Sequence, residues 1–143
     1  ISMPVLTLDQ AQTIVSAALA HGRDHGLKPL AVAVLDARGA LKAFAAADGT
    51  ALRRGEIAIG KANGALGLGV GSRTLGTMAV ERPHFIAAAT QAIGPLVPVP
   101  GGVLIAGVDG PLGAVGISGD TSDNDEAAVL AGIAASGLTA QPG

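Results

Sequence analysis

The sequence contains no cysteine. This absence excludes disulfide bonds, thiolate catalysis, iron–sulfur clusters and cysteine-ligated zinc, because each of these needs the sulfur of a cysteine side chain. Any metal bound by this chain must therefore be held by other side chains.

Aromatic residues are almost as scarce: there is no tryptophan or tyrosine, and only Phe44 and Phe85 remain. The apolar content of 49% rules out disorder, so the core must be built from alanine, valine, leucine and isoleucine. The net charge is −2 and no basic stripe is present. Because bases would find neither stacking partners nor a cationic surface, we expect no nucleic-acid partner.

Long apolar runs are also missing, since none reaches the roughly 18 residues of a membrane-spanning helix. The first residues lack the basic and then apolar pattern of a signal peptide. We therefore expect no membrane partner and a cytoplasmic location, although a signal peptide that had been removed would leave no trace.

The 143 residues fit a single domain, with residues 1–5 and 138–143 as flexible tails. Thr7 and Gln10 form a capping box that begins a helix, and Gly26 ends it. The rest of the chain predicts strands at 30–35 and 40–46, helices at 53–66, 72–80 and 83–92, strands at 103–108 and 112–118, and a last helix that ends near residue 135.

Turn sequences at 36–39 and 109–111 join the strands into two β-hairpins. The order α-β-β-α-α-α-β-β-α has no β-α-β alternation, which argues against a doubly wound fold. The fold class is therefore α+β, with a central antiparallel sheet built from two β-hairpins and flanked by helices.

Several short motifs, in this order and at these spacings, resemble the GlcG/HbpS-type family. They lie at residues 6–8, 34–39, 48–50, 58–62, 95–102, 113–119 and 123–126. The resemblance implies an antiparallel sheet with flanking helices, assembly into tetramers to octamers, and kinship with the C-terminal domain of corrinoid adenosyltransferases. It also implies haem or iron binding, with a role in haem degradation or redox sensing.

His21 and His25 are four residues apart, so both imidazoles project from one face of the first helix. This spacing suits a bis-imidazole metal site, and the resemblance makes a first-helix histidine a reasonable haem contact. Of the two, we rank His21 first because it lies further from the helix end. The alternative is that both are polar surface residues, since an imidazole is favourable near a helix C-terminus.

Lys61 lies among small and apolar residues, so its ammonium must either be paired or face a cleft. We predict a small-molecule site bounded by Lys61, Arg73 and the segment that ends in Pro100, Gly101 and Gly102. Its ligand would be anionic, either a haem propionate or an organic carboxylate. The alternative for Lys61, equally weighted, is an ion pair with Glu56 or Asp48.

This site predicts that Gly102→Val blocks the pocket while the fold stays largely intact. It also predicts that Lys61→Ala weakens anion binding with little change in melting temperature. The acidic residues Asp120, Asp123, Asp125 and Glu126 are interpreted as helix capping in preference to a cation site, because their spacing does not fit an EF-hand loop.

Two functions follow from these residues. The first is an oligomeric protein that binds haem or iron. The second is a cofactor-independent enzyme that acts on a small organic or aromatic acid. No nucleotide cofactor is expected, because the glycines at 67–71 follow a helix and lack the third glycine of a dinucleotide motif. A homo-oligomer is expected because 14% charged residues leave apolar patches on a monomer.

Overall fold

The computed structural model describes residues 4–143 and confirms the α+β class. Its helices are α1 (Leu8–Asp24), α2 (Arg54–Leu68), α3 (Ser72–Glu81), α4 (Pro83–Ile93) and α5 (Ser122–Ala135). Its strands are β1 (Ala31–Asp36), β2 (Leu41–Ala46), β3 (Gly102–Ile105), β4 (Gly113–Ser118) and β5 (Ala140–Gln141). Among residues 4–143, no helix has both the length and the apolar character needed to cross a membrane.

The strands form one antiparallel sheet in the order β2-β1-β4-β3-β5. The two predicted hairpins therefore pair through β1 and β4. Strand β5 adds to the edge at β3, and it lies in the segment 138–143 that the sequence analysis assigned to a tail. Residues 1–3 of the other predicted tail lie outside the described residues.

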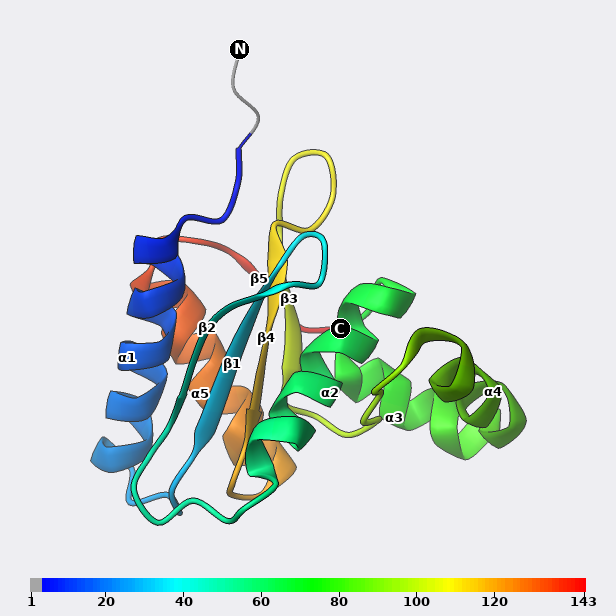
Figure 1. Cartoon of the computed structure of the whole chain (residues 1–143), viewed down its shortest axis with the longest axis horizontal. Coiled ribbons are helices and arrows are strands. Elements are labelled where there is room, and N and C mark those ends of the chain that lie inside the picture. The colour runs from blue at the N-terminus through cyan, green and yellow to red at the C-terminus, as the bar shows by residue number, and fades with distance from the viewer. Residues whose placement is uncertain (1–3) are drawn as a thin grey trace.

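The sheet is covered on both faces, with α1 and α5 on one side and α2 on the other (Figure 1). The two faces carry side chains of different size. Branched residues face α1 and α5, namely Val32, Val34, Val103, Ile105, Val115 and Ile117. The face beneath α2 carries mostly small residues, among them Ala31, Ala33 and Ala114.

Small residues let α2 lie very close to β4. A Cβ atom at Gly116 would lie 1.9 Å from the carbonyl oxygen of Ala58, so only glycine fits there. The facing side of α2 is itself built from buried alanines, Ala58, Ala62 and Ala65. The shortage of aromatic residues is thus matched by a short distance between helix and sheet.

A second stripe of small residues on α2 receives the segment that follows α4. Cβ atoms at Gly60, Gly64 and Gly67 would lie 2.7 to 2.9 Å from side-chain atoms of Val97, Leu96 and Ile93. Helices α3 and α4 extend outward from there (Figure 1) and form a separate apolar cluster around Leu75 and Ile86. Helix α2 itself ends at Gly69, whose backbone is in the left-handed conformation with φ 75°.

Replacing Gly116 with alanine should lower the free energy of unfolding by at least about 2 kcal/mol, because the new methyl group must displace backbone. Urea unfolding followed by circular dichroism measures this. Gly67→Ala is the matched control, because its methyl group meets only the flexible end of Ile93 and alanine favours a helix by about 1 kcal/mol. Equal losses in the two variants would show that the close approach at Gly116 is unimportant.

Candidate functional site

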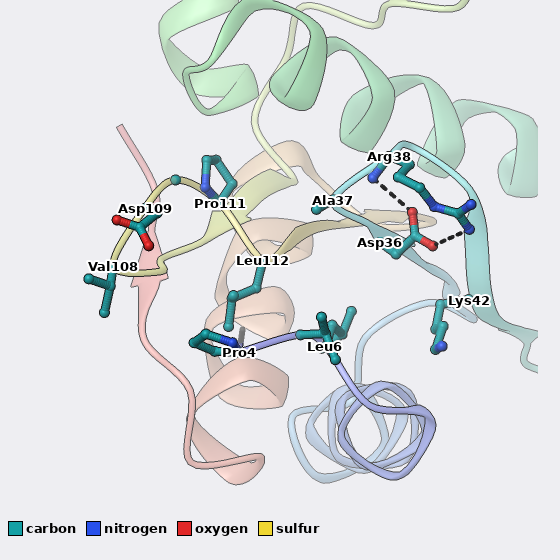
Figure 2. A pocket seen from close by; sticks show the side chains of 12 residues that line it. Pro4, Leu6, Asp36, Ala37, Arg38, Lys42, Val108, Asp109, Pro111 and Leu112 are labelled. Carbon is teal, nitrogen blue, oxygen red and sulfur yellow. Dashed lines mark hydrogen bonds and ion pairs between the residues drawn. The ribbon is translucent and has the colours of Figure 1, made fainter. Parts of the chain in front are cut away.

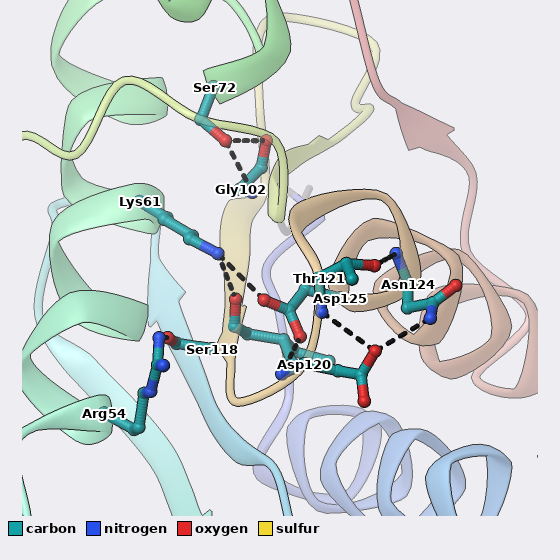
Figure 3. A network of polar contacts seen from close by, with 10 residues as sticks. Arg54, Lys61, Ser72, Gly102, Ser118, Asp120, Thr121, Asn124 and Asp125 are labelled. Carbon is teal, nitrogen blue, oxygen red and sulfur yellow. Dashed lines mark hydrogen bonds and ion pairs between the residues drawn. The ribbon is translucent and has the colours of Figure 1, made fainter. Parts of the chain in front are cut away.

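Lys61 links three elements in the interior (Figure 3). From α2, its Nζ donates to the carbonyl oxygen of Ile117 at 2.9 Å and to Oδ2 of Asp125 at 3.1 Å. The exposed fractions of the Lys61 and Asp125 side chains are 3% and 2%. Lys61 is therefore paired, as one alternative required, but its partner is Asp125 and not Glu56 or Asp48.

Burial shifts the pKa values of both members of this pair. It lowers the pKa of the Lys61 ammonium and raises the pKa of the Asp125 carboxyl, because water no longer stabilises either charge. The attraction between the two charges opposes both shifts. Asp125 also accepts the N–H of Asp120 on its second oxygen at 2.9 Å, so both carboxylate oxygens are used.

Asp125 was grouped with helix-capping residues in the sequence analysis, and its pairing with Lys61 was missed. The N-cap of α5 is Thr121, whose hydroxyl accepts the N–H of Asn124. A signal for Asp125 was present in the helical spacing, because it lies one turn before the buried residues Ala128 and Val129. A carboxylate in phase with an apolar stripe needs a cation in the interior.

The predicted wall at 98–102 does meet Lys61. A Cβ atom at Gly101 would lie 2.8 Å from Nζ of Lys61, and one at Gly102 would lie 2.4 Å from the carbonyl oxygen of Lys61. Gly102 is also held by Ser72, whose Oγ accepts the Gly102 N–H at 2.7 Å and donates to its carbonyl at 3.2 Å. Pro100 precedes this contact and is partly exposed.

This packing argues against two predicted effects of substitution. Gly102→Val should disturb the fold, because a Cβ atom there would lie 2.4 Å from the backbone carbonyl oxygen of Lys61 on α2. Lys61→Ala should lower the melting temperature, because it would leave Asp125 as a buried carboxyl group without its cation.

Arg73 lies at the start of α3 and reaches toward α5. Its guanidinium pairs with Asp123 and Glu126, and about half of its side chain is exposed. Asp123 and Glu126 thus neutralise Arg73 at the surface, as Asp125 neutralises Lys61 in the interior. In this arrangement both predicted anion-binding cations are already paired with carboxylates of α5.

The two candidate ligand histidines do come together. The rings of His21 and His25 stack with their centroids 4.0 Å apart, and Nδ1 of His25 donates to the carbonyl oxygen of His21 at 2.9 Å. Partial burial, and next the neighbouring His25, lower the pKa of His21. Within residues 4–143, no group of three or more histidine and carboxylate side chains is arranged to hold a metal ion.

The end of α1 that carries these histidines borders a pocket of about 500 Å³. Gly22 and Arg23, which follow His21 directly, line it from the helix. Leucines and a second cation complete the lining, among them Leu19, Leu27, Leu30 and Lys28. The lining also includes the acidic residue Asp48, and it includes neither His21 nor His25. His21 lies two residues from both Leu19 and Arg23, so its imidazole leaves α1 on nearly the opposite side of the helix from these two lining residues.

Removing Lys61 alone should be costly. We expect Lys61→Ala to lower the free energy of unfolding by about 3 kcal/mol or more, because one charge of a buried pair is left alone. Replacing both partners, as Lys61→Met with Asp125→Leu, should recover most of the loss. Urea unfolding of the three proteins measures both effects.

The matched control is Arg53→Ala, which breaks the exposed ion pair between Arg53 and Glu56 on the same helix. It should change stability little, because exposed pairs are screened by water. A loss in Lys61→Ala no larger than in Arg53→Ala would contradict a structural role for the buried pair.

Known structures share this fold. The crystal structure of HbpS matches with a TM-score of 0.81 and 25% identity, covering 94% of this chain and 92% of that one. The crystal structure of a PduOC:heme complex matches with a TM-score of 0.86 and 20% identity, covering 98% and 100%. Protein ORFY of Klebsiella pneumoniae matches with a TM-score of 0.82 and 21% identity, covering 95% and 94%.

No curated protein matches this sequence. The family model described as "Haem degrading protein HbpS-like" matches residues 6–134, which is most of the chain. This protein belongs to the HbpS-like family of haem degrading proteins.

Proposed function

We propose that this protein binds haem at the C-terminal end of α1. The observation that carries the proposal is the stacked pair His21 and His25 at the end of α1. The family and the structural likeness to a PduOC:heme complex support the same ligand.

The hydrogen bond of His25 determines which ring nitrogen is free. A carbonyl oxygen can only accept, so Nδ1 of His25 carries the proton that points to His21 O. In the neutral ring Nε2 is then the nitrogen with the free lone pair, and this is the form in which imidazole binds iron. The lowered pKa of His21 likewise keeps that ring neutral at neutral pH.

The pocket at the same end of α1, which lies on another side of the helix from His21, carries groups of the kinds that haem needs. Leu19, Leu27 and Leu30 offer apolar surface to the macrocycle. Arg23 and Lys28 offer positive charge to the propionates. When bound, haem would supply an iron centre capable of redox chemistry, and these residues would hold and orient it.

We also propose that the protein is a homo-oligomer, within the range of tetramer to octamer. Large apolar side chains are exposed on several elements: Val5, Leu8, Leu41, Phe44, Leu52, Val80, Phe85, Val99 and Val108. Covering such residues stabilises an assembly, because apolar surface is removed from water. A neighbouring subunit would also add a wall to the open pocket at the C-terminal end of α1.

Hemin titration should give a shifted Soret band for the wild type and none for His21→Ala/His25→Ala. The single variants His21→Ala and His25→Ala identify which imidazole binds the iron. Loss of that imidazole should weaken hemin binding at least tenfold, or by about 1.4 kcal/mol. Protons compete with iron for an imidazole, so hemin binding should weaken as the pH is lowered. If His21 is the ligand, the midpoint of this loss should lie below pH 6.5, because the pKa of His21 is lowered from that value.

His84 is the control, because it lies on α4 and away from α1. His84→Ala should bind hemin as the wild type does. A titration unchanged in the double variant, or weakened equally by His84→Ala, would remove the α1 histidines from the site.

Light scattering coupled to gel filtration should return a mass of at least four chains of 13.8 kDa at micromolar concentration. The physical reason is the exposed apolar surface described above. A monomer mass would contradict the proposed assembly while leaving the hemin result unaffected.

A further inference from the structure

A second pocket, of about 400 Å³, lies at the other end of α1 (Figure 2). Three segments that are distant in sequence line it: residues 4–6 before α1, the turn at 36–38 together with Lys42 of β2, and the turn at 108–112. Its volume is within the range of pockets that hold small organic molecules. Neither the histidines nor the Lys61 network contributes to it.

One side of this pocket is apolar. Pro4, Leu6 and Leu112 form its floor, and Pro111 faces them from the turn (Figure 2). The floor is anchored, because Leu6 is 4% exposed and the Leu112 N–H donates to the carbonyl of Ile105 at 2.9 Å. A small molecule would therefore meet a preformed apolar surface.

The opposite side carries two cations, Arg38 and Lys42 (Figure 2). Asp36 accepts the N–H groups of Arg38 and Ala40 and one guanidinium N–H of Arg38, which fixes the turn and orients that side chain. These bonds outweigh the effect of burial and lower the pKa of Asp36. Four N–H groups of the guanidinium remain available, because Asp36 takes one of five.

Lys42, unlike Arg38, forms no ion pair with a carboxylate among the described residues. Among residues 4–143, no carboxylate oxygen lies within 4.0 Å of its ammonium. The other acidic lining residue, Asp109, stands at the far side of the pocket beyond Pro111 (Figure 2). The pocket is therefore cationic at one end and apolar across its floor.

We propose that this pocket binds an amphipathic organic monocarboxylate. The carboxylate would lie between Lys42 and the free N–H groups of Arg38, and the apolar body would cover Leu6 and Leu112. Asp109 at the other end disfavours a second acidic group, so a monoacid is selected over a diacid. This assigns to the chain an organic-acid site that is separate from the proposed haem site.

The two sites can be tested independently. Helix α1 has 17 residues and is roughly 25 Å long, with this pocket at its start and the histidines at its end. Substitutions at one end should leave the other unchanged. Failure of hemin binding would thus not count against the carboxylate site, nor the reverse.

The test is a titration with sodium octanoate, 1-octanol and octylamine, followed by NMR of the methyl groups. Octanoate should shift the methyl signals of Leu6, Leu112 and Val108, whereas octanol should bind about tenfold more weakly and octylamine more weakly still. Arg38→Gln/Lys42→Gln should weaken octanoate about tenfold and leave octanol unchanged.

The matched control is Arg53→Gln/Arg82→Gln, which removes two exposed cations that line neither pocket of α1. Octanoate should bind this variant as it binds the wild type. The proposal is overturned by equal binding of octanoate and octanol, by shifts confined to other methyl groups, or by equal losses in the two double variants. Both variants change exposed side chains, and unchanged melting curves would show that they fold.

Discussion

The close approach of α2 to β4 is the constraint on which the rest of the structure depends. With two aromatic residues in the chain, large side chains cannot fill a wide gap between helix and sheet. Gly116 and the alanines of α2 close that gap instead. Close packing recovers dispersion contacts that a looser interface of small residues would lose. The branched side chains are then concentrated on the opposite face, beneath α1 and α5.

The same approach explains how a lysine is kept in the interior. Because α2 lies against β4, Lys61 reaches the carbonyl of Ile117 and the first turn of α5. A buried ion pair gains little net stability over an apolar pair of similar size, but one charge alone is strongly unfavourable. The pair therefore favours the one arrangement in which α2, β4 and α5 all meet.

The sequence predicted the helices and both hairpins, because capping residues, glycines and turn sequences mark their ends locally. It did not predict β5, since two residues are too short to show a strand pattern. Lys61 stood out because its neighbours are small and apolar, and the helical spacing of Asp125 marked a buried carboxylate. The two residues are 64 positions apart, so no local pattern shows that they pair with each other. The pocket between residues 4–6 and the two turns was not predicted either, because three distant segments form it.

The glycine stripe on α2 divides the molecule into parts of unequal local stability. Helices α3 and α4 pack on their own small cluster and join the rest mainly through the contacts of Gly60, Gly64 and Gly67 with residues 93–97. Ser72 fastens the start of α3 to β3, and Arg73 fastens it to α5, so an opening unit begins after Arg73. Amide hydrogens in α3 and α4 should then exchange with solvent through a local opening, while those of β1 and β4 exchange only when the whole sheet unfolds.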